Sequence, residues 1–163
     1  MKIYAEKDEN TLLKIKEIER EAYAGTDFAQ MQDCYNWEDM ADYLECSIDE
    51  ICFLCTDSYY VLVAEHDDYA EIADLACRPD KRCDLKKVAE FIEEFDKPLT
   101  LDSRELTSYP ILKYMEKRGR AVIMEDEIDD WNGERYHSMR IVTTKALERD
   151  PSICETKETD YDR

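Results

Sequence analysis

The sequence predicts an α/β protein of the α+β type: a mixed, mostly antiparallel sheet of about seven strands, flanked by helices on both faces. Two observations carry this prediction. Short runs of β-branched, aromatic and apolar residues recur along the chain, and segments with apolar residues at helical spacing separate several of them. The length of 163 residues suits one domain, and 44% apolar with 39% charged residues allows both a core and high solubility.

The first half of the chain is expected to hold one strand, two helices and three further strands. Lys2–Ala5 forms the opening strand, and Asn10 and Asn36 are expected to cap the two helices, because an Asn side chain can accept a bond from a free helical amide. The three further strands are Ile51–Thr56, Tyr59–Glu65 and Tyr69–Cys77. The segments between these strands have the length of hairpin loops.

The second half alternates helices and strands. Asp84 is expected to cap a helix, the strand Pro98–Asp102 follows, and a further helix runs from Ser108 to a C-cap at Gly119. Two strands then meet in a hairpin around Asn132-Gly133, a strong signal for a two-residue turn. The domain is expected to span residues 1–144, with a polar C-terminal tail over 145–163.

The charge of the chain limits its partners. Forty-one Asp and Glu against 22 Lys and Arg give a formal net charge of −19, which disfavours nucleic acid and anionic membranes. The field favours a cationic amine or a basic protein as partner. The alternative interpretation is that the charge provides solubility and nothing more.

Compartment and metal content follow from the N-terminus and the cysteines. No apolar run reaches the roughly 18 residues of a membrane span, and the first residues lack the apolar region of a secretory signal. Seven cysteines without an export signal are expected to be reduced thiols in the cytoplasm. Cys52 and Cys55 would face opposite sides of a strand, so we interpret them as buried apolar side chains and predict no metal site.

Three short stretches support a family resemblance. They are DLACRPD (Asp74–Asp80), EKRGR (Glu116–Arg120) and IKEIEREAY (Ile15–Tyr23). They resemble the fourth strand, the end of the fourth helix and the first helix of the GNAT-type N-acetyltransferases. Together with the order of elements, the resemblance covers about residues 1–144. It implies the GNAT-like acyl-CoA acyltransferase fold and transfer of acetyl from acetyl-CoA to an amine.

The resemblance implies that acetyl-CoA, as co-substrate, binds at the fourth strand and the loop after it. The family's pyrophosphate loop carries glycines, but the matching positions here are Leu85 and Lys87 or, in the alternative alignment, Lys81 and Cys83. In both alignments side chains stand where backbone amides would approach the phosphates. Basic side chains are the expected substitute. The predicted cofactor-binding residues are Leu75, Ala76, Cys77, Arg78, Lys81, Arg82, Cys83, Asp84, Lys86, Lys87 and Ser108.

The catalytic residues are also assigned through the resemblance. Glu71 is the expected general base and Asp74 the expected contact to the substrate, because the family often uses a carboxylate on or near this strand. The family's tyrosine that protonates the leaving thiolate falls at Met115, and Tyr114 is the adjacent candidate, about 100° around the helix.

Two functions remain open at this point. The first is an N-acetyltransferase acting on a small cationic molecule or a protein amine. The second is a catalytically degenerate GNAT-like acidic domain that binds a basic protein partner as an inhibitor or regulator. The missing glycines and the displaced tyrosine favour the second function, whereas the retained strand and its basic cluster favour the first. Either a monomer or a homodimer is compatible with the sequence.

Overall fold

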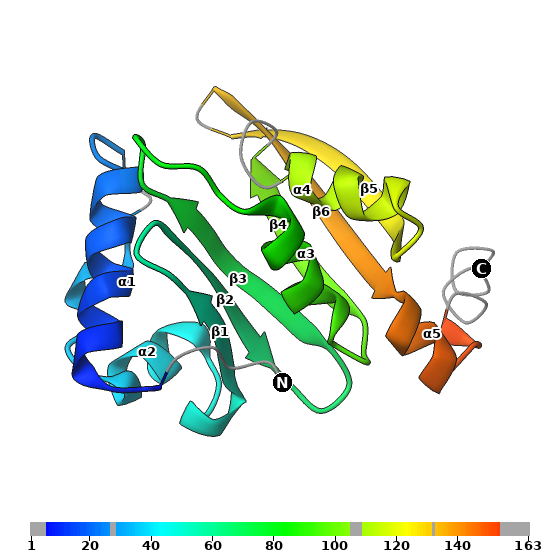
Figure 1. Cartoon of the computed structure of the whole chain (residues 1–163), viewed down its shortest axis with the longest axis horizontal. Helices are drawn as coiled ribbons and strands as arrows, with labels where there is room; N and C mark the ends of the chain where they lie inside the picture. The colour runs from blue at the N-terminus through cyan, green and yellow to red at the C-terminus, as the bar shows by residue number, and fades with distance from the viewer. Residues whose placement is uncertain (1–5, 27–28, 105–108, 132, 154–163) are drawn as a thin grey trace. The chain divides into compact units, whose positions relative to one another are not determined.

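A computed structural model describes residues 6–26, 29–104, 109–131 and 133–153 (Figure 1). The chain divides into two compact units. The first unit comprises Met1–His66 and Ile72–Asp84, and the second comprises Asp67–Glu71 and Leu85–Arg163.

The described strands form one six-stranded sheet in the order β1-β2-β3-β4-β6-β5. They are β1 (Ile51–Cys55), β2 (Tyr59–Glu65), β3 (Ala70–Cys77), β4 (Leu99–Arg104), β5 (Ala121–Trp131) and β6 (Glu134–Thr143). The β1–β2, β4–β6 and β5–β6 pairs are antiparallel, and β3–β4 is parallel through two residue pairs. The prediction of a mixed, mostly antiparallel sheet is confirmed. The expected strand Lys2–Ala5 lies outside the described residues.

Two helices and two short 3₁₀ turns pack on β1 and β2 in the first unit. They are α1 (Glu9–Ala22), η1 (Met31–Asp33), α2 (Trp37–Leu44) and η2 (Ile48–Glu50). Their apolar faces meet alternate residues of the strands, and Trp37 stacks on Phe53 with ring centroids 5.3 Å apart. The Asn36 cap is confirmed, since its side chain accepts from the Asp39 amide. The α1 cap is Asp8 rather than Asn10, because the Asp8 carboxylate accepts from the Thr11 amide at 2.8 Å.

The second unit contains the helices α3 (Leu85–Glu93), α4 (Tyr109–Lys117) and α5 (Thr144–Arg149). The β5–β6 hairpin is confirmed, and Gly133 in its turn has φ +77°, which suits a residue without a side chain. Gly119 after α4 has φ +72°, as expected of a C-cap glycine.

The region predicted as a polar tail begins with structure. α5 starts immediately after β6, where the Thr143 hydroxyl accepts from the Ala146 amide at 3.1 Å. Ala146 and Ile153 are buried with Val142 in a small apolar cluster. Leu147 packs against this cluster as well, and these few apolar residues do not stand out in a polar sequence. Residues 154–163 lie outside the described part.

Cys52 and Cys55 both lie in β1. Cys52 is 6% exposed and its thiol contacts a Glu65 carboxylate oxygen at 3.5 Å, whereas Cys55 is only partly buried, and neither takes part in a disulfide. The described ranges contain no group of three or more His, Cys, Asp or Glu side chains placed to hold a metal ion. Within those ranges, no helix has the length and apolarity needed to cross a bilayer.

Candidate functional site

The predicted site residues fall into both compact units. The first unit contains Asp74, Leu75, Ala76, Cys77, Arg78, Lys81, Arg82, Cys83 and Asp84. The second contains Glu71, Lys86, Lys87 and Tyr114. Ser108 lies outside the described residues.

Asp74 is the centre of a hydrogen-bonded cluster in the first unit. One carboxylate oxygen accepts from the Tyr23 hydroxyl at 2.8 Å and from the Leu75 amide at 2.9 Å, and the other accepts from the Tyr60 hydroxyl at 2.5 Å. Tyr60 is fully buried, and burial is the main cause that raises its pKa, followed by the charge of Asp74. Tyr60 therefore remains a neutral donor, and the Asp74 side chain has a fixed position.

A second carboxylate, Glu19 on α1, lies near Asp74. It is 1% exposed and accepts from the Met31 amide, at 3.0 and 3.1 Å, and from the Gln32 side chain at 3.0 Å. Burial raises the pKa of Glu19, these hydrogen bonds oppose the rise, and the charge of Asp74 adds to it. We refer to Glu19, Tyr23, Tyr60 and Asp74 as the tyrosine–carboxylate cluster. Its two carboxylates make this part of the first unit favourable for a cation.

Arg78 follows β3, and its charge is neutralised by α1. Its guanidinium pairs with Glu17 at 3.0 Å and with Glu21, and its Nε donates to the Asp57 carbonyl at 2.7 Å. The Arg78 side chain is only 15% exposed. It therefore joins α1 to the end of β3 and to the β1–β2 turn. Arg78 is thus a cation of the predicted cofactor site that acids already engage.

The segment Cys77–Asp84, here called the basic loop, turns back on itself. The Lys81 amide donates to the Arg78 carbonyl at 3.0 Å, and the Cys77 thiol contacts the Lys81 carbonyl at 3.3 Å. Lys81 and Arg82 are exposed. Burial raises the pKa of the Cys83 thiol to about 12, so this cysteine is not an activated nucleophile. The loop can thus offer two cationic side chains to an anion.

Tyr59, at the start of β2, lies close to this loop. It is 4% exposed, and its hydroxyl has no hydrogen-bond partner in the described part of the chain. Burial raises its pKa to about 12, with further contributions from Cys83, Asp84 and Cys77. Sequence reasoning did not select Tyr59, because an aromatic residue in an apolar strand is typical of a core position.

The predicted residues of the second unit are less constrained. Glu71 pairs with Thr100 through the backbone, and its side chain is exposed. Lys86 and Lys87 are exposed in the first turn of α3. Tyr114 is partly buried, and the Arg118 guanidinium lies over its ring at 5.3 Å, whereas Met115 is fully buried. Met115 therefore serves the core, and Tyr114 keeps the more accessible side chain.

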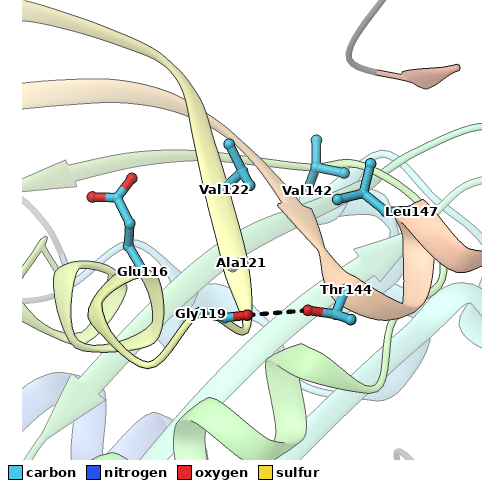
Figure 2. Close-up of a pocket in the computed structure, with 7 residues that line it drawn as sticks. All are labelled: Glu116, Gly119, Ala121, Val122, Val142, Thr144 and Leu147. Carbon is cyan, nitrogen blue, oxygen red and sulfur yellow. Dashed lines mark hydrogen bonds between the residues drawn. The ribbon is translucent and has the colours of Figure 1, made fainter. Parts of the chain in front are cut away.

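The second unit also has a small pocket of about 290 Å³ (Figure 2). Val122 and Val142, from paired positions of β5 and β6, and Leu147 of α5 provide its apolar side. Thr144 donates to the Gly119 carbonyl at 3.4 Å across its base (Figure 2). The remaining lining residues are Glu116 and Ala121. No predicted site residue belongs to this lining, so the pocket gives no support to the predicted chemistry.

Sequence reasoning selected Asp74 but missed Glu19, Tyr23 and Tyr60. Glu19 appears in the sequence as one more acid on an amphipathic helix, and only its 1% exposure distinguishes it. Tyr23 and Tyr60 lie 51 and 14 residues from Asp74 along the chain, so no local spacing connects them.

Comparison with solved structures identifies the fold. A protein assigned to the GNAT family from Desulfovibrio desulfuricans is 11% identical, with a TM-score of 0.51 over 83% of this chain and 94% of that one. The protein yncA from Salmonella typhimurium, solved with acetyl-CoA, is also 11% identical, with a TM-score of 0.51 over 82% and 88%. No protein-family model and no curated protein matches the sequence. The chain has the GNAT-type acyltransferase fold, as the sequence predicted.

Proposed function

We propose that this protein is an N-acetyltransferase that transfers acetyl from acetyl-CoA to an amine. The observation that carries the proposal is the arrangement of Asp74. This carboxylate lies on β3 of a GNAT-type fold and accepts hydrogen bonds from two tyrosine hydroxyls. The two carboxylates of the cluster, Asp74 and Glu19, and the net charge of −19 favour a cationic acceptor, either a small amine or a basic protein. The reaction replaces the thioester bond of acetyl-CoA with an amide bond and releases CoA and a proton.

The residues have distinct proposed roles. Asp74 positions the amine, because its own hydrogen bonds fix its oxygens. Glu71, which is exposed and can exchange protons with water, is the proposed general base. Tyr114 is the proposed donor to the leaving thiolate. Lys81 and Arg82 are proposed to hold the CoA phosphates, since exposed cations can form charge-assisted bonds without loop glycines.

A second candidate function is a catalytically degenerate acidic domain that binds a basic protein as an inhibitor or regulator. The observation in its favour is the engagement of Arg78 by Glu17 and Glu21, which removes one cation from the predicted phosphate site. A chain without CoA affinity would retain the fold and its acidic surface, and those are enough to bind a basic partner.

Calorimetric titration with CoA and with acetyl-CoA separates the two functions. We expect weak binding that decreases with salt, because exposed charges are screened. Arg82→Ala should weaken CoA binding by about tenfold or more, the value of one charge-assisted hydrogen bond. Glu71→Gln should keep the affinity and lower turnover with an amine acceptor. Absence of heat at millimolar CoA for the wild type would reject the acetyltransferase and leave the binding domain.

A further inference from the structure

Arg140 on β6 is a partly buried cation that no acid of the described part of the chain engages. Its Nη1 atom is buried, and none of the described residues accepts a hydrogen bond from it. β6 lies between β4 and β5, so its backbone is paired on both sides and the exposed part of Arg140 is side chain. Although the chain has 41 acidic residues, this guanidinium is therefore open to an acceptor from outside the protein.

Arg140 belongs to a row of three paired residues that crosses the sheet within the second unit. Glu71 of β3 pairs with Thr100 of β4, and Thr100 pairs with Arg140 of β6. Paired residues of neighbouring strands point to the same face of a sheet, and two strand spacings place the Cα atoms of Glu71 and Arg140 about 10 Å apart. The proposed general base and the guanidinium therefore project from one face, with the short Thr100 side chain between them.

The two faces of this part of the sheet differ in polarity. The face opposite the row is apolar and buried, and its residues are Ala70, Leu99, Leu101, Met139 and Ile141. On the face of the row, Glu71 is exposed, and Thr100 and Arg140 are partly buried. The next pair on this face, Asp102 and Ser138, is exposed as well, and the Ser138 hydroxyl donates to the Asp102 carboxylate at 2.7 Å. The row thus lies on a polar face that a small ligand can reach.

The charges of the row define the chemistry of that ligand. An ammonium group is complementary to the carboxylate of Glu71, and the nearby Asp102 adds a second negative charge. At the other end, the planar guanidinium of Arg140 suits a carboxylate, because it can donate two parallel hydrogen bonds to the two oxygens. Both side chains are long and shorten the distance between the two charged ends. A small molecule with an amine and a carboxylate fits this arrangement.

We propose that Arg140 binds the carboxylate of the acceptor and so selects amines that carry one, such as free amino acids. The proposal rests on the acetyltransferase function, in which Glu71 is the base, and it narrows the acceptor to a small molecule. The carboxylate takes no part in the transfer of the acetyl group. Arg140 is accordingly a specificity residue, and its loss should affect acceptors with a carboxylate more than those without one.

The test compares acceptors that differ only in the carboxylate. Each standard amino acid and its carboxamide is given with acetyl-CoA to the wild type, Arg140→Met and Arg135→Met, and the release of CoA is recorded. Arg135 is an exposed residue on the opposite face of β6 and provides the control. Binding is measured separately, without acetyl-CoA, as the shift in melting temperature at millimolar acceptor.

We expect the wild type to prefer one or more amino acids to their carboxamides. Arg140→Met should lower kcat/KM for those amino acids about ten- to a hundredfold, the usual value of hydrogen bonds to a charged group, and should change kcat/KM for the carboxamides little. Without acceptor, its melting temperature should be equal to or above that of the wild type, because methionine replaces the stem of the side chain and removes an unpaired charge. Arg135→Met should behave as the wild type.

The other outcomes are also decisive. Equal use of amino acids and carboxamides by the wild type would overturn the proposal, as would a preference that Arg140→Met retains. A lower melting temperature of Arg140→Met without acceptor would overturn it too, since the guanidinium would then have a partner within the protein. If no acceptor is acetylated, but amino acids raise the melting temperature of the wild type and not of Arg140→Met, the carboxylate site stands and the acetyltransferase is rejected. Acetylation of amines without regard to a carboxylate would do the reverse.

Discussion

The tyrosine–carboxylate cluster and the basic loop are both polar regions of the first unit, but they differ in how their groups are satisfied. In the cluster, the Asp74 oxygens accept three hydrogen bonds, two of them from tyrosines. In the basic loop, Lys81 and Arg82 are exposed. Internally paired groups hold a structure together, and Asp74 combines this with its proposed contact to the amine. Substitutions in the cluster should therefore lower stability, whereas those of Lys81 and Arg82 in the loop should change CoA affinity at nearly constant stability.

The largest effect is expected for Asp74→Ala. The substitution removes the acceptor of the Tyr60 hydroxyl and the nearer acceptor of the Tyr23 hydroxyl, which keeps a longer bond of 3.3 Å to the Leu75 carbonyl. A buried donor without a partner costs about 1–3 kcal/mol. Because Tyr23 is only partly buried, we expect a loss of about 2–4 kcal/mol in the free energy of unfolding, measured by urea denaturation. Asp68→Ala, in an exposed position before β3, should stay within about 0.5 kcal/mol of the wild type.

A double variant tests the cause of that loss. Tyr60→Phe in the Asp74→Ala background removes the buried hydroxyl that the first substitution leaves unpaired, so part of the stability should return. If the two losses simply add, the Tyr60–Asp74 hydrogen bond is not the reason for the instability. The cluster would then not differ from the loop in the way that its hydrogen bonds predict.

The next largest effect is a difference in stability between variants of the two arginines of the basic loop, Arg78 and Arg82. Arg78 resembles a residue of the cluster, because it is paired with Glu17 and Glu21 and donates to the Asp57 carbonyl. Arg78→Ala should lower the free energy of unfolding by about 1–2 kcal/mol, a value reduced by the partial exposure of both glutamates. Its CoA affinity should change less than that of Arg82→Ala.

Arg82→Ala is the matched control, with unchanged stability and weaker CoA binding. Both variants are measured by urea denaturation and by calorimetry with CoA. A tenfold loss of affinity in Arg78→Ala at unchanged stability would show that the α1 acids release this arginine to the ligand. Arg78 would then act as a ligand-binding residue, and not as a structural residue like those of the cluster.

The sequence could predict the strands and helices because each depends on local pattern. The β5–β6 hairpin follows from Asn132-Gly133, and α2 from the Asn36 cap. The cluster could not be predicted, since it forms when α1 and β2 bring Tyr23 and Tyr60 to β3. Likewise, the basic character of the loop is visible in the sequence, but the neutralisation of Arg78 depends on Glu17 and Glu21, which lie 57 or more positions away in the chain.

The smallest effect concerns the pH dependence of the cluster. Burial raises the pKa of Glu19 above its ordinary value of 4.5, so the folded protein retains this proton where the unfolded chain has released it. The stability from the protonated carboxyl is fully present below pH 4.5 and is lost as pH rises through the folded value. Hydrogen bonds from Met31 and Gln32 favour the ionised form and limit the size of this loss.

Glu19→Gln removes the titration while it keeps the shape of the side chain. We expect the free energy of unfolding of the wild type, relative to Glu19→Gln, to decrease as pH rises from about 4.5 to neutrality. A single titrating group can change it by at most about 1.4 kcal/mol per pH unit. Urea denaturation across this range measures the difference, with Glu38→Gln, an exposed residue of α2, as the control. Parallel curves for the wild type and Glu19→Gln would mean that its hydrogen bonds fully offset burial, and that the cluster is satisfied in its ionised form.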